Sequence, residues 1–286
     1  MPELPEVEAI RQVLAPVMIG REISRVTVAR RDVVRGLDGR RRGRLTPASL
    51  GEGLRIKGVD RRGKQLLVRF GGGGGLVIRL GMSGRLDLSV GRTRSVPPHR
   101  HVVWAFEGVA GDTVRVAFVD PRRFGGVHLV RDERDLQNRL LANLGPEATE
   151  IDGQALHTQL GRTRRAVKVA LLDQAVLAGV GNIYADEALF RARIHPETPG
   201  SDLDRQASDR LARAIRTILS AAIDAGGSTI RDHRLPEGVE GDYRSSHQVY
   251  GRSGQPCSAC DGSLQEIRLA ARSTTFCPSC QASGSF

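Results

Sequence analysis

The sequence contains little cysteine, few aromatic residues and no long apolar run. Only four of its 286 residues are cysteine, and all four lie in one C-terminal pattern, so no disulfide framework can hold the rest of the chain. We therefore expect a reducing, cytoplasmic setting. No stretch approaches the roughly 18 apolar residues of a membrane span, and the acidic N-terminus carries no signal-like apolar segment. These absences predict a soluble, non-secreted protein.

Acidic residues are fewer than basic residues in this chain. The chain has 43 Lys and Arg against 32 Asp and Glu, which gives a formal net charge of +11 and a pI near 10.6. Such a charge indicates a polyanionic partner, and a membrane surface and a nucleic acid both fit it. The cluster Arg40, Arg41, Arg42 and Arg44 fits either a solvated loop or a sequence-independent contact with nucleic acid.

The N-terminal half, from Glu22 to about Val130, reads as short strands separated by glycine turns. This spacing is typical of an antiparallel sandwich or barrel. The run Gly71 to Gly75 predicts a loose hairpin loop with no chemical role. We expect strands over residues 23–28, 64–70, 76–80, 101–106 and 114–119.

The C-terminal half becomes helical after Gly145 and Pro146. We expect helices over residues 166–176, 183–192 and 202–225, with a domain boundary between 132 and 150. A length of 286 residues is enough for about two domains, each with its own core.

The four cysteines form the pattern Cys257-x2-Cys260-x16-Cys277-x2-Cys280. This is the spacing of a zinc ribbon, and four thiolates leave no open position on the metal, so the ion is structural. A segment this short buries little apolar area and depends on the metal to fold. Between the two pairs, Arg272 fits a phosphate contact or an ordinary exposed charge.

The first residues place an amine and several carboxylates together. If Met1 is removed, the ring nitrogen of Pro2 becomes a free secondary amine, and an α-amino group has a pKa near about 8, well below the value of lysine. Pro5 suits the first turn of a helix whose positive end would lower that pKa further. Condensation of such an amine with an aldehyde sugar gives an iminium, which is lyase chemistry. Glu3 could transfer protons, with Glu6 one helical turn away, although the same residues also make a good helix start.

Two turns carry further candidates. Gly179-Val180-Gly181-Asn182 lies between two predicted helices, and Asn182 as an N-cap would offer free N–H groups to a phosphate, although a plain helix end and restart would look similar. The turn from Asp120 to Gly125 projects Arg122 and Phe124, which suit a wedge that replaces an extruded base. Met82 could be a further filler. Taken singly, Met82 and Phe124 would more often be core residues.

Together these motifs resemble the formamidopyrimidine-DNA glycosylase family, the bacterial Fpg (MutM) enzymes related to endonuclease VIII. The matching segments follow the family order and cover nearly the whole chain. They are residues 1–8, 61–64, 80–84, 120–125 and 179–187 and the four-cysteine finger.

The resemblance implies the catalytic roles. Pro2 is then the nucleophile that attacks the sugar C1′, and Glu3 is the proton donor and acceptor, with Glu6 beside it. Lys64 assists β-elimination and contacts phosphate, and Arg272 acts in δ-elimination.

The resemblance also implies two sets of residues that contact DNA. The implied DNA contacts are His99, Arg122, Thr163, Lys168 and Asn182. The implied trio that fills the space left by the base is Met82, Arg122 and Phe124. Three departures bear on damage preference: Arg79 replaces a common histidine, Thr163 replaces a basic residue between Arg162 and Arg164, and residues 232–247, which should include the lesion-capping loop, diverge.

The implied fold is α+β with three domains. An antiparallel β-sandwich domain spans 1–131, a helix–two-turn–helix domain spans 132–248, and a zinc finger with one structural Zn2+ spans 249–286. The implied partner is damaged double-stranded DNA held across the cleft, and the expected state is a monomer without obligatory protein partners in the bacterial cytoplasm, associated with the nucleoid.

The function expected from this resemblance is a bifunctional glycosylase and abasic-site lyase that removes oxidised purines and cleaves the strand by β,δ-elimination. Three alternatives remain: a glycosylase for oxidised pyrimidines like endonuclease VIII, a non-catalytic zinc-bearing protein that binds damaged DNA, and a lyase with little base excision. Phe124 and the Glu3 to Glu6 segment favour the purine branch, and Pro2, Glu3, Lys64 and Arg272 together argue against pure binding.

Overall fold

The computed structural model describes residues 2–36, 46–91, 98–107, 113–228, 235–238 and 240–282, apart from the side chains of residues 139 and 140. The chain divides into two compact units. Unit 1 comprises Met1–Ala142 with Gly226–Gly241, and unit 2 comprises Asn143–Ala225 with Asp242–Phe286. The cluster Arg40, Arg41, Arg42 and Arg44, which fits either a solvated loop or a contact with nucleic acid, lies outside the described residues.

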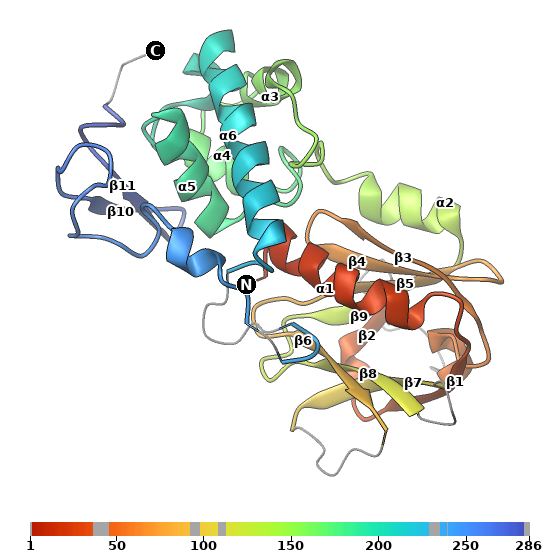
Figure 1. Ribbon diagram of the computed structural model, residues 1–286. Helices are drawn as coiled ribbons and strands as arrows, with labels where there is room; N and C mark the ends of the chain where they lie inside the picture. The colour runs from red at the N-terminus through yellow and green to blue at the C-terminus, as the bar shows by residue number, and fades with distance from the viewer. Residues whose placement is uncertain are drawn as a thin grey trace. The chain divides into compact units, whose positions relative to one another are not determined.

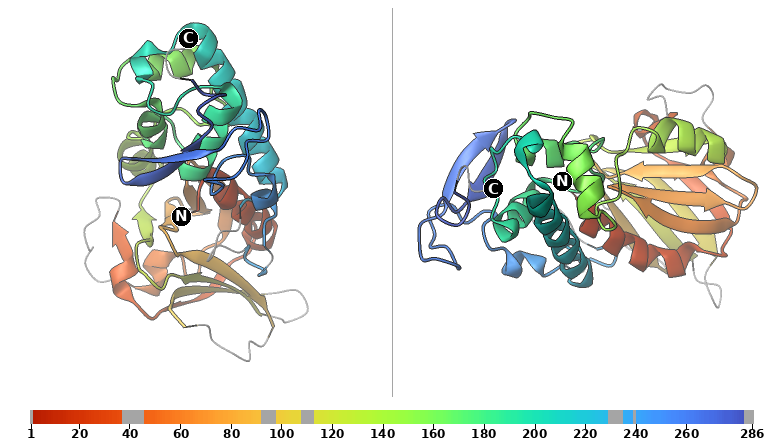
Figure 2. Two further views of the ribbon diagram at one scale, coloured as in Figure 1. Left: turned by 90° about the vertical axis from the view of Figure 1, so that its left-hand side faces the viewer. Right: turned by 90° about the horizontal axis from the view of Figure 1, so that it is seen from above.

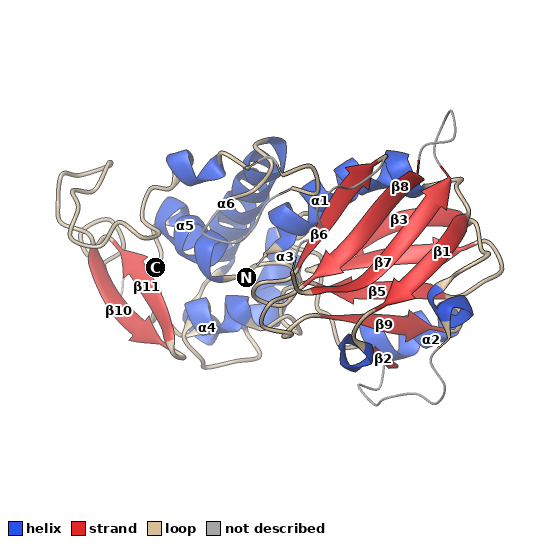
Figure 3. Cartoon of the chain, turned by 90° about the horizontal axis from the view of Figure 1, so that it is seen from below, coloured by secondary structure: helices blue, strands red, loops and turns tan. Residues whose placement is uncertain are grey.

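Unit 1 is a β-sandwich with one long helix, as Figure 3 shows. The first sheet has the order β1-β7-β8-β6, and its strands are antiparallel. The second has the order β2-β9-β5-β4-β3, and only the β2–β9 pair is parallel. The strands are β1 (Ile23–Val28), β2 (Val34–Gly36), β3 (Ile56–Arg62), β4 (Gln65–Phe70), β5 (Gly75–Arg79), β6 (Arg85–Val90), β7 (Arg100–Glu107), β8 (Thr113–Val119) and β9 (Gly126–Val130).

The core of unit 1 lies between the two sheets and helix α1 (Leu4–Met18), which contacts β3 and β4 (Figure 1). Val7, Ile10 and Leu14 recur on one helix face and are almost fully buried. Burial of each such side chain stabilises the fold by about 1.5–3 kcal/mol. The only tryptophan, Trp104, is buried in this core and donates from its indole N–H to the Leu50 carbonyl at 3.1 Å.

The predicted sandwich is confirmed, and all five predicted strands occur within one residue of their expected ends. Strands β2, β3, β6 and β9 were not predicted. β3 has the sequence IKGVDRR, whose charges and glycine hide its alternation. The glycine turn is tighter than expected, because Gly75 belongs to β5 and an added Cβ there would lie 2.1 Å from the Val68 carbonyl oxygen.

Unit 2 is helical and carries one β-hairpin, which Figure 2 shows in blue. Its helices are α3 (Gly153–Leu160), α4 (Val167–Leu172), α5 (Asn182–Ala192) and α6 (Arg205–Asp224), and its strands are β10 (Gln265–Leu269) and β11 (Arg272–Phe276). Asp204 caps α6 by accepting from the Ala207 N–H at 2.6 Å. Helix α4 stops before the predicted end at 176 because Asp173 leaves helical geometry.

Short helical segments complete the two units. In unit 1 these are η1 (Arg31–Val33), η2 (Pro47–Leu50), α2 (Glu133–Leu136) and the π-turn η4 (Gln137–Leu141); in unit 2 they are η5 (Gly200–Asp202) and η6 (Tyr243–Ser246). Among the helices described, none is both long and apolar enough to cross a bilayer.

Candidate active site and DNA-contacting residues

The first turn of α1 is buried together with its acidic residues. Glu3 is the N-cap, and its N–H donates to Glu6 Oε2 at 2.7 Å in a capping box. The other Glu6 oxygen accepts from the Ser228 N–H at 2.8 Å. Pro2 is buried directly before the N-cap of this 15-residue helix. Both carboxylates are therefore held beside Pro2 at the positive end of the helix dipole.

Gly227 is required by this arrangement. It has φ +85°, and an added Cβ would lie 2.8 Å from Glu6 Oε1. Sequence reasoning missed Gly227 and Ser228, because they are more than 220 residues from Glu6 in the chain.

Lys64 lies half-buried in the β3–β4 turn, after Gly63 at φ +54°. Arg61 fastens this turn to α1, because its side chain donates to Glu8 Oε2 and to the Gly63 carbonyl, each at 3.0 Å. Burial raises the pKa of Glu8, but hydrogen bonds and charge from Arg11 and Arg61 outweigh it and the net pKa is lowered. The turn that bears Lys64 is thus tied by an ionic link to the helix that begins beside Pro2.

Met82 and Phe124 are exposed, by 40% and 60%, so the core interpretation of these two residues is wrong. Their turns are packed backbone against backbone: a Cβ on Gly81 would lie 2.5 Å from the Gly125 nitrogen. Arg122 is exposed, with its guanidinium carbon 4.8 Å from the centre of the Phe124 ring. The three predicted void-filling residues therefore share one surface of unit 1, while their role stays a prediction.

In unit 2, Gly181 and not Asn182 is the N-cap of α5. The predicted capping role of Asn182 is therefore wrong, because Asn182 is already the first residue of the helix. Its side-chain N–H donates to the Ser273 carbonyl of β11 at 3.0 Å. Asn182 thus joins the helical module to the zinc hairpin.

Lys168 is fully buried, which distinguishes it from an ordinary phosphate-binding lysine. Its Nζ pairs with Asp186 and lies 3.4 Å from the Asn182 carbonyl oxygen, while Asp186 Oδ2 accepts from the Thr275 N–H at 3.2 Å. Burial raises the pKa of Asp186 to about 7, against the lowering effect of Lys168. The geometry directs Lys168 toward α5 and the hairpin, and its contact with DNA stays a prediction.

The loop between α3 and α4 holds the other predicted contacts. Thr163 Oγ1 accepts from the backbone N–H and the Nε–H of Arg165, at 3.2 and 3.1 Å, so Thr163 orients an arginine. Arg162 and Arg164 are exposed on either side. This loop presents positive charge although Thr163 itself has none.

The four cysteine Sγ atoms lie within 4.8 Å of one another. Two of the separations are 4.0 Å, between Cys257 and Cys280, and 3.4 Å, between Cys260 and Cys277. Tetrahedral zinc with Zn–S bonds of about 2.3 Å needs sulfur atoms about 3.8 Å apart, so the cluster fits one zinc ion. Arg272 begins β11 after a turn in which Ala270 and Ala271 have φ +45° and +59°, and its side chain is exposed.

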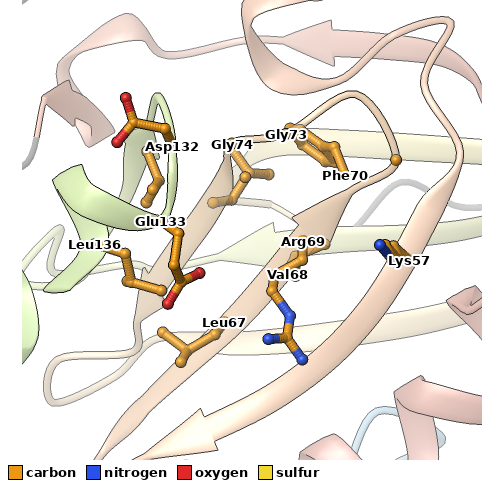
Figure 4. A pocket seen from close by; sticks show the side chains of 14 residues that line it. Lys57, Leu67, Val68, Arg69, Phe70, Gly73, Gly74, Asp132, Glu133 and Leu136 are labelled. Atoms are coloured by element: carbon orange, nitrogen blue, oxygen red, sulfur yellow. The ribbon is translucent and has the colours of Figure 1, made fainter.

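A separate pocket of about 410 Å³ lies in unit 1 between the β4–β5 turn and α2, with Lys57 and Arg69 on one side and Asp132 and Glu133 on the other (Figure 4). None of the described residues that line it is a predicted site residue.

Three family models match the chain in order. They describe the formamidopyrimidine-DNA glycosylase N-terminal domain, over residues 1–127, the H2TH domain of the same enzymes, over 144–234, and the zinc finger found in FPG and IleRS, over 254–282. The chain is 44% identical to the formamidopyrimidine-DNA glycosylase of Gluconobacter oxydans, across 98% of this chain and 100% of that protein.

Solved structures agree with these matches. The crystal structure of MutM (FPG) from Thermus thermophilus has a TM-score of 0.84 and 40% identity, and covers 99% of this chain and 100% of that one. A complex between Lactococcus lactis Fpg and DNA containing an abasic site has a TM-score of 0.85 and 33% identity, with 98% and 100% covered. The chain therefore belongs to the formamidopyrimidine-DNA glycosylase family.

Proposed function

We propose that this protein is a bifunctional DNA glycosylase and abasic-site lyase that removes oxidised purines from duplex DNA. The observation that carries the proposal is the buried start of α1, where Glu3 and Glu6 are fixed by hydrogen bonds beside Pro2. Binding alone needs no nucleophile, whereas two buried acidic residues next to a potential N-terminal amine suit proton transfer during nucleophilic catalysis.

In the proposed reaction, the Pro2 nitrogen attacks the sugar C1′ and the glycosidic bond breaks, so the base leaves with the bonding electrons and a proton. Glu3 opens the sugar by moving a proton to O4′, which leaves an iminium between Pro2 and C1′. The iminium acidifies C2′, and loss of a C2′ proton expels the 3′ phosphate. Loss of the C4′ proton then expels the 5′ phosphate, and water hydrolyses the iminium, which releases the remaining sugar as an unsaturated aldehyde and frees the Pro2 amine. The product is a one-nucleotide gap with phosphate at both ends.

The other predicted residues take supporting roles. Lys64, in the turn tied to α1, assists the first elimination and contacts a phosphate, and Arg272 assists the second. His99, Arg122, Thr163, Lys168 and Asn182 serve DNA binding, and Met82, Arg122 and Phe124 occupy the space of the extruded base. We propose that the protein acts as a monomer on nucleoid DNA in the cytoplasm.

Borohydride trapping tests the reaction, because it reduces an enzyme–sugar iminium to a covalent adduct. The protein with a native N-terminus is mixed with a duplex that carries 8-oxoguanine opposite cytosine, and separately with an abasic duplex. The matched control carries one extra residue before Pro2, which turns its amine into an amide. Adducts on both duplexes, absent in the control, are expected.

The other outcomes are informative. An adduct on abasic DNA alone would support the lyase activity but would not show which base the protein removes. A duplex with thymine glycol would then test whether oxidised pyrimidines are the substrate. No adduct on any duplex would overturn the catalytic proposal in favour of a DNA-binding protein. An equally active control would refute Pro2 as nucleophile.

A further inference from the structure

Asp120 is fully buried in unit 1, although sequence reasoning gave it no role beyond starting a turn. Its carboxylate closes that turn. Oδ2 accepts from the Gly125 N–H at 2.8 Å, and Oδ1 lies 3.3 Å from the Arg122 N–H. The backbone on both sides of Phe124 is therefore fixed by one side chain.

The same carboxylate reaches the neighbouring turn. Ser83, next to Met82, donates its hydroxyl to Asp120 Oδ1 at 2.6 Å, and the Ser83 oxygen also lies 3.3 Å from the Arg122 N–H. Ser83 is only 6% exposed, so this link is shielded from water. A hydrogen bond between a hydroxyl and a buried carboxylate is among the strong ones.

The main chain of Asp120 adds a third connection. Its N–H donates to the His99 carbonyl at 3.2 Å, and its carbonyl accepts from His101 Nε2 at 2.8 Å. His99 has φ +62°, a conformation that a non-glycine residue keeps only when its surroundings hold it. One residue thus contacts the turns that present Met82, Arg122, Phe124 and His99.

We infer that Asp120 is a positioning residue that assembles these four side chains into one preformed surface before DNA arrives. Ordering flexible turns upon binding would cost free energy for each immobilised side chain, and a surface fixed in the free protein avoids that cost. The part of this inference that concerns base extrusion rests on the proposed function; the ordering of the two turns does not.

The proposal depends on a carboxylate and not merely on a polar side chain. Asp120→Asn keeps the size but replaces one acceptor oxygen with an NH₂ group, which would face either the Gly125 N–H or the Ser83 hydroxyl. Ser83→Ala removes the side-chain link between the turns and one acceptor near the Arg122 N–H, and it leaves the hydrogen bond from the Gly125 N–H to Asp120 in place. Asp120→Asn therefore tests the closure of the turn from Asp120 to Gly125, and Ser83→Ala tests the link between this turn and the one that carries Met82.

Asp32 provides the matched control. It pairs with Arg123 of the same turn at 2.8 Å, but the two side chains are 31% and 47% exposed. Exposed ion pairs contribute little, so Asp32→Asn should leave both turns in place.

The first measurement is hydrogen exchange of the Arg122 and Gly125 amides in the free protein. Asp120→Asn should accelerate exchange by about tenfold to hundredfold, as expected for the loss of a buried hydrogen bond to a charged group. Ser83→Ala should accelerate Arg122 more than Gly125, and Asp32→Asn should change neither. Unchanged exchange in Asp120→Asn would overturn the inference whether or not the protein is an enzyme.

The second measurement compares two DNA substrates in single-turnover reactions. Asp120→Asn should slow excision of 8-oxoguanine opposite cytosine by at least about tenfold. With the enzyme in saturating excess, so that weaker DNA contacts from Arg122 and His99 do not limit the rate, it should cleave a bulged abasic nucleotide, which has no opposite base and leaves no space to fill, at a rate within about twofold of that of the unsubstituted protein. An equal loss of rate on both substrates would indicate a general folding or activity defect and would refute the positioning role. If the unsubstituted protein were inactive on both substrates, that result would count against the proposed function alone.

Discussion

Replacing Lys168 by methionine should destabilise unit 2 strongly. The Lys168 and Asp186 side chains are 0% and 1% exposed, so removal of the ammonium leaves the buried Asp186 carboxylate without its ion-pair partner. Breaking a buried ion pair in this way costs about 3–5 kcal/mol of the free energy of unfolding. Replacing both residues, Lys168→Met with Asp186→Leu, should recover most of that loss, because apolar pairs often substitute for buried ion pairs without cost.

The loss in Lys168→Met should also depend on pH. Burial raises the pKa of Asp186 to about 7, while Lys168 lowers it, so its pKa in the variant should rise further. A carboxyl whose folded-state pKa is raised contributes stability that is complete below its ordinary value and is lost as pH rises through the folded-state pKa. The variant should therefore lose less at about pH 5 than at about pH 8.

Urea unfolding followed by far-ultraviolet circular dichroism, with zinc and reductant present, measures these changes. Trp104 fluorescence serves as a separate probe of unit 1, which contains the only tryptophan. A loss below about 1 kcal/mol in Lys168→Met, as for an exposed pair, would refute the reasoning. A double variant that is less stable than both single variants would do the same.

Three further outcomes can be measured. Cys277→Ser should release zinc, detected with a chromogenic chelator, and weaken DNA binding; retention of the metal would contradict a four-thiolate site. Gly227→Ala should cost at least about 1–3 kcal/mol of unfolding free energy, because its φ is +85° and its Cβ would lie 2.8 Å from Glu6 Oε1. DNA affinity should fall steeply with salt, and Arg122→Ala should lower the logarithmic slope by about one if Arg122 contacts a phosphate; a flat response would argue against phosphate contacts.

The sequence predicted the parts of the fold that depend on local pattern. Strands with clear apolar alternation were found, such as Arg100–Glu107, in which Val102, Trp104 and Phe106 are buried, and so was the cysteine spacing. Burial was not predictable in the same way. Lys168 looks like a surface cation in the sequence, and its partner Asp186 is 18 residues away.

The site shows the same division. The N-terminal acidic cluster could be expected from helix-capping chemistry, since Glu3 and Glu6 have capping-box spacing. The roles of Asp120 and Ser83 depend on two turns 37 residues apart that meet only in the folded sandwich. The sequence carried a local signal for the role of Asp120 but not for that of Ser83, because an aspartate at the first position of a turn commonly closes that turn.

The way the chain is divided between its units limits how the protein can be dissected. Unit 1 takes in Gly226–Gly241 after the chain has already entered unit 2, so the polypeptide passes between the units three times. An expressed fragment that ends at Ala142 would lack Ser228, and Glu6 would lose a backbone donor to its carboxylate. A minimal sandwich would need residues 226–241 supplied as a peptide or grafted through a short linker. A fragment that ends after α2 and η4 would have an α1 whose Glu6 lacks the Ser228 donor.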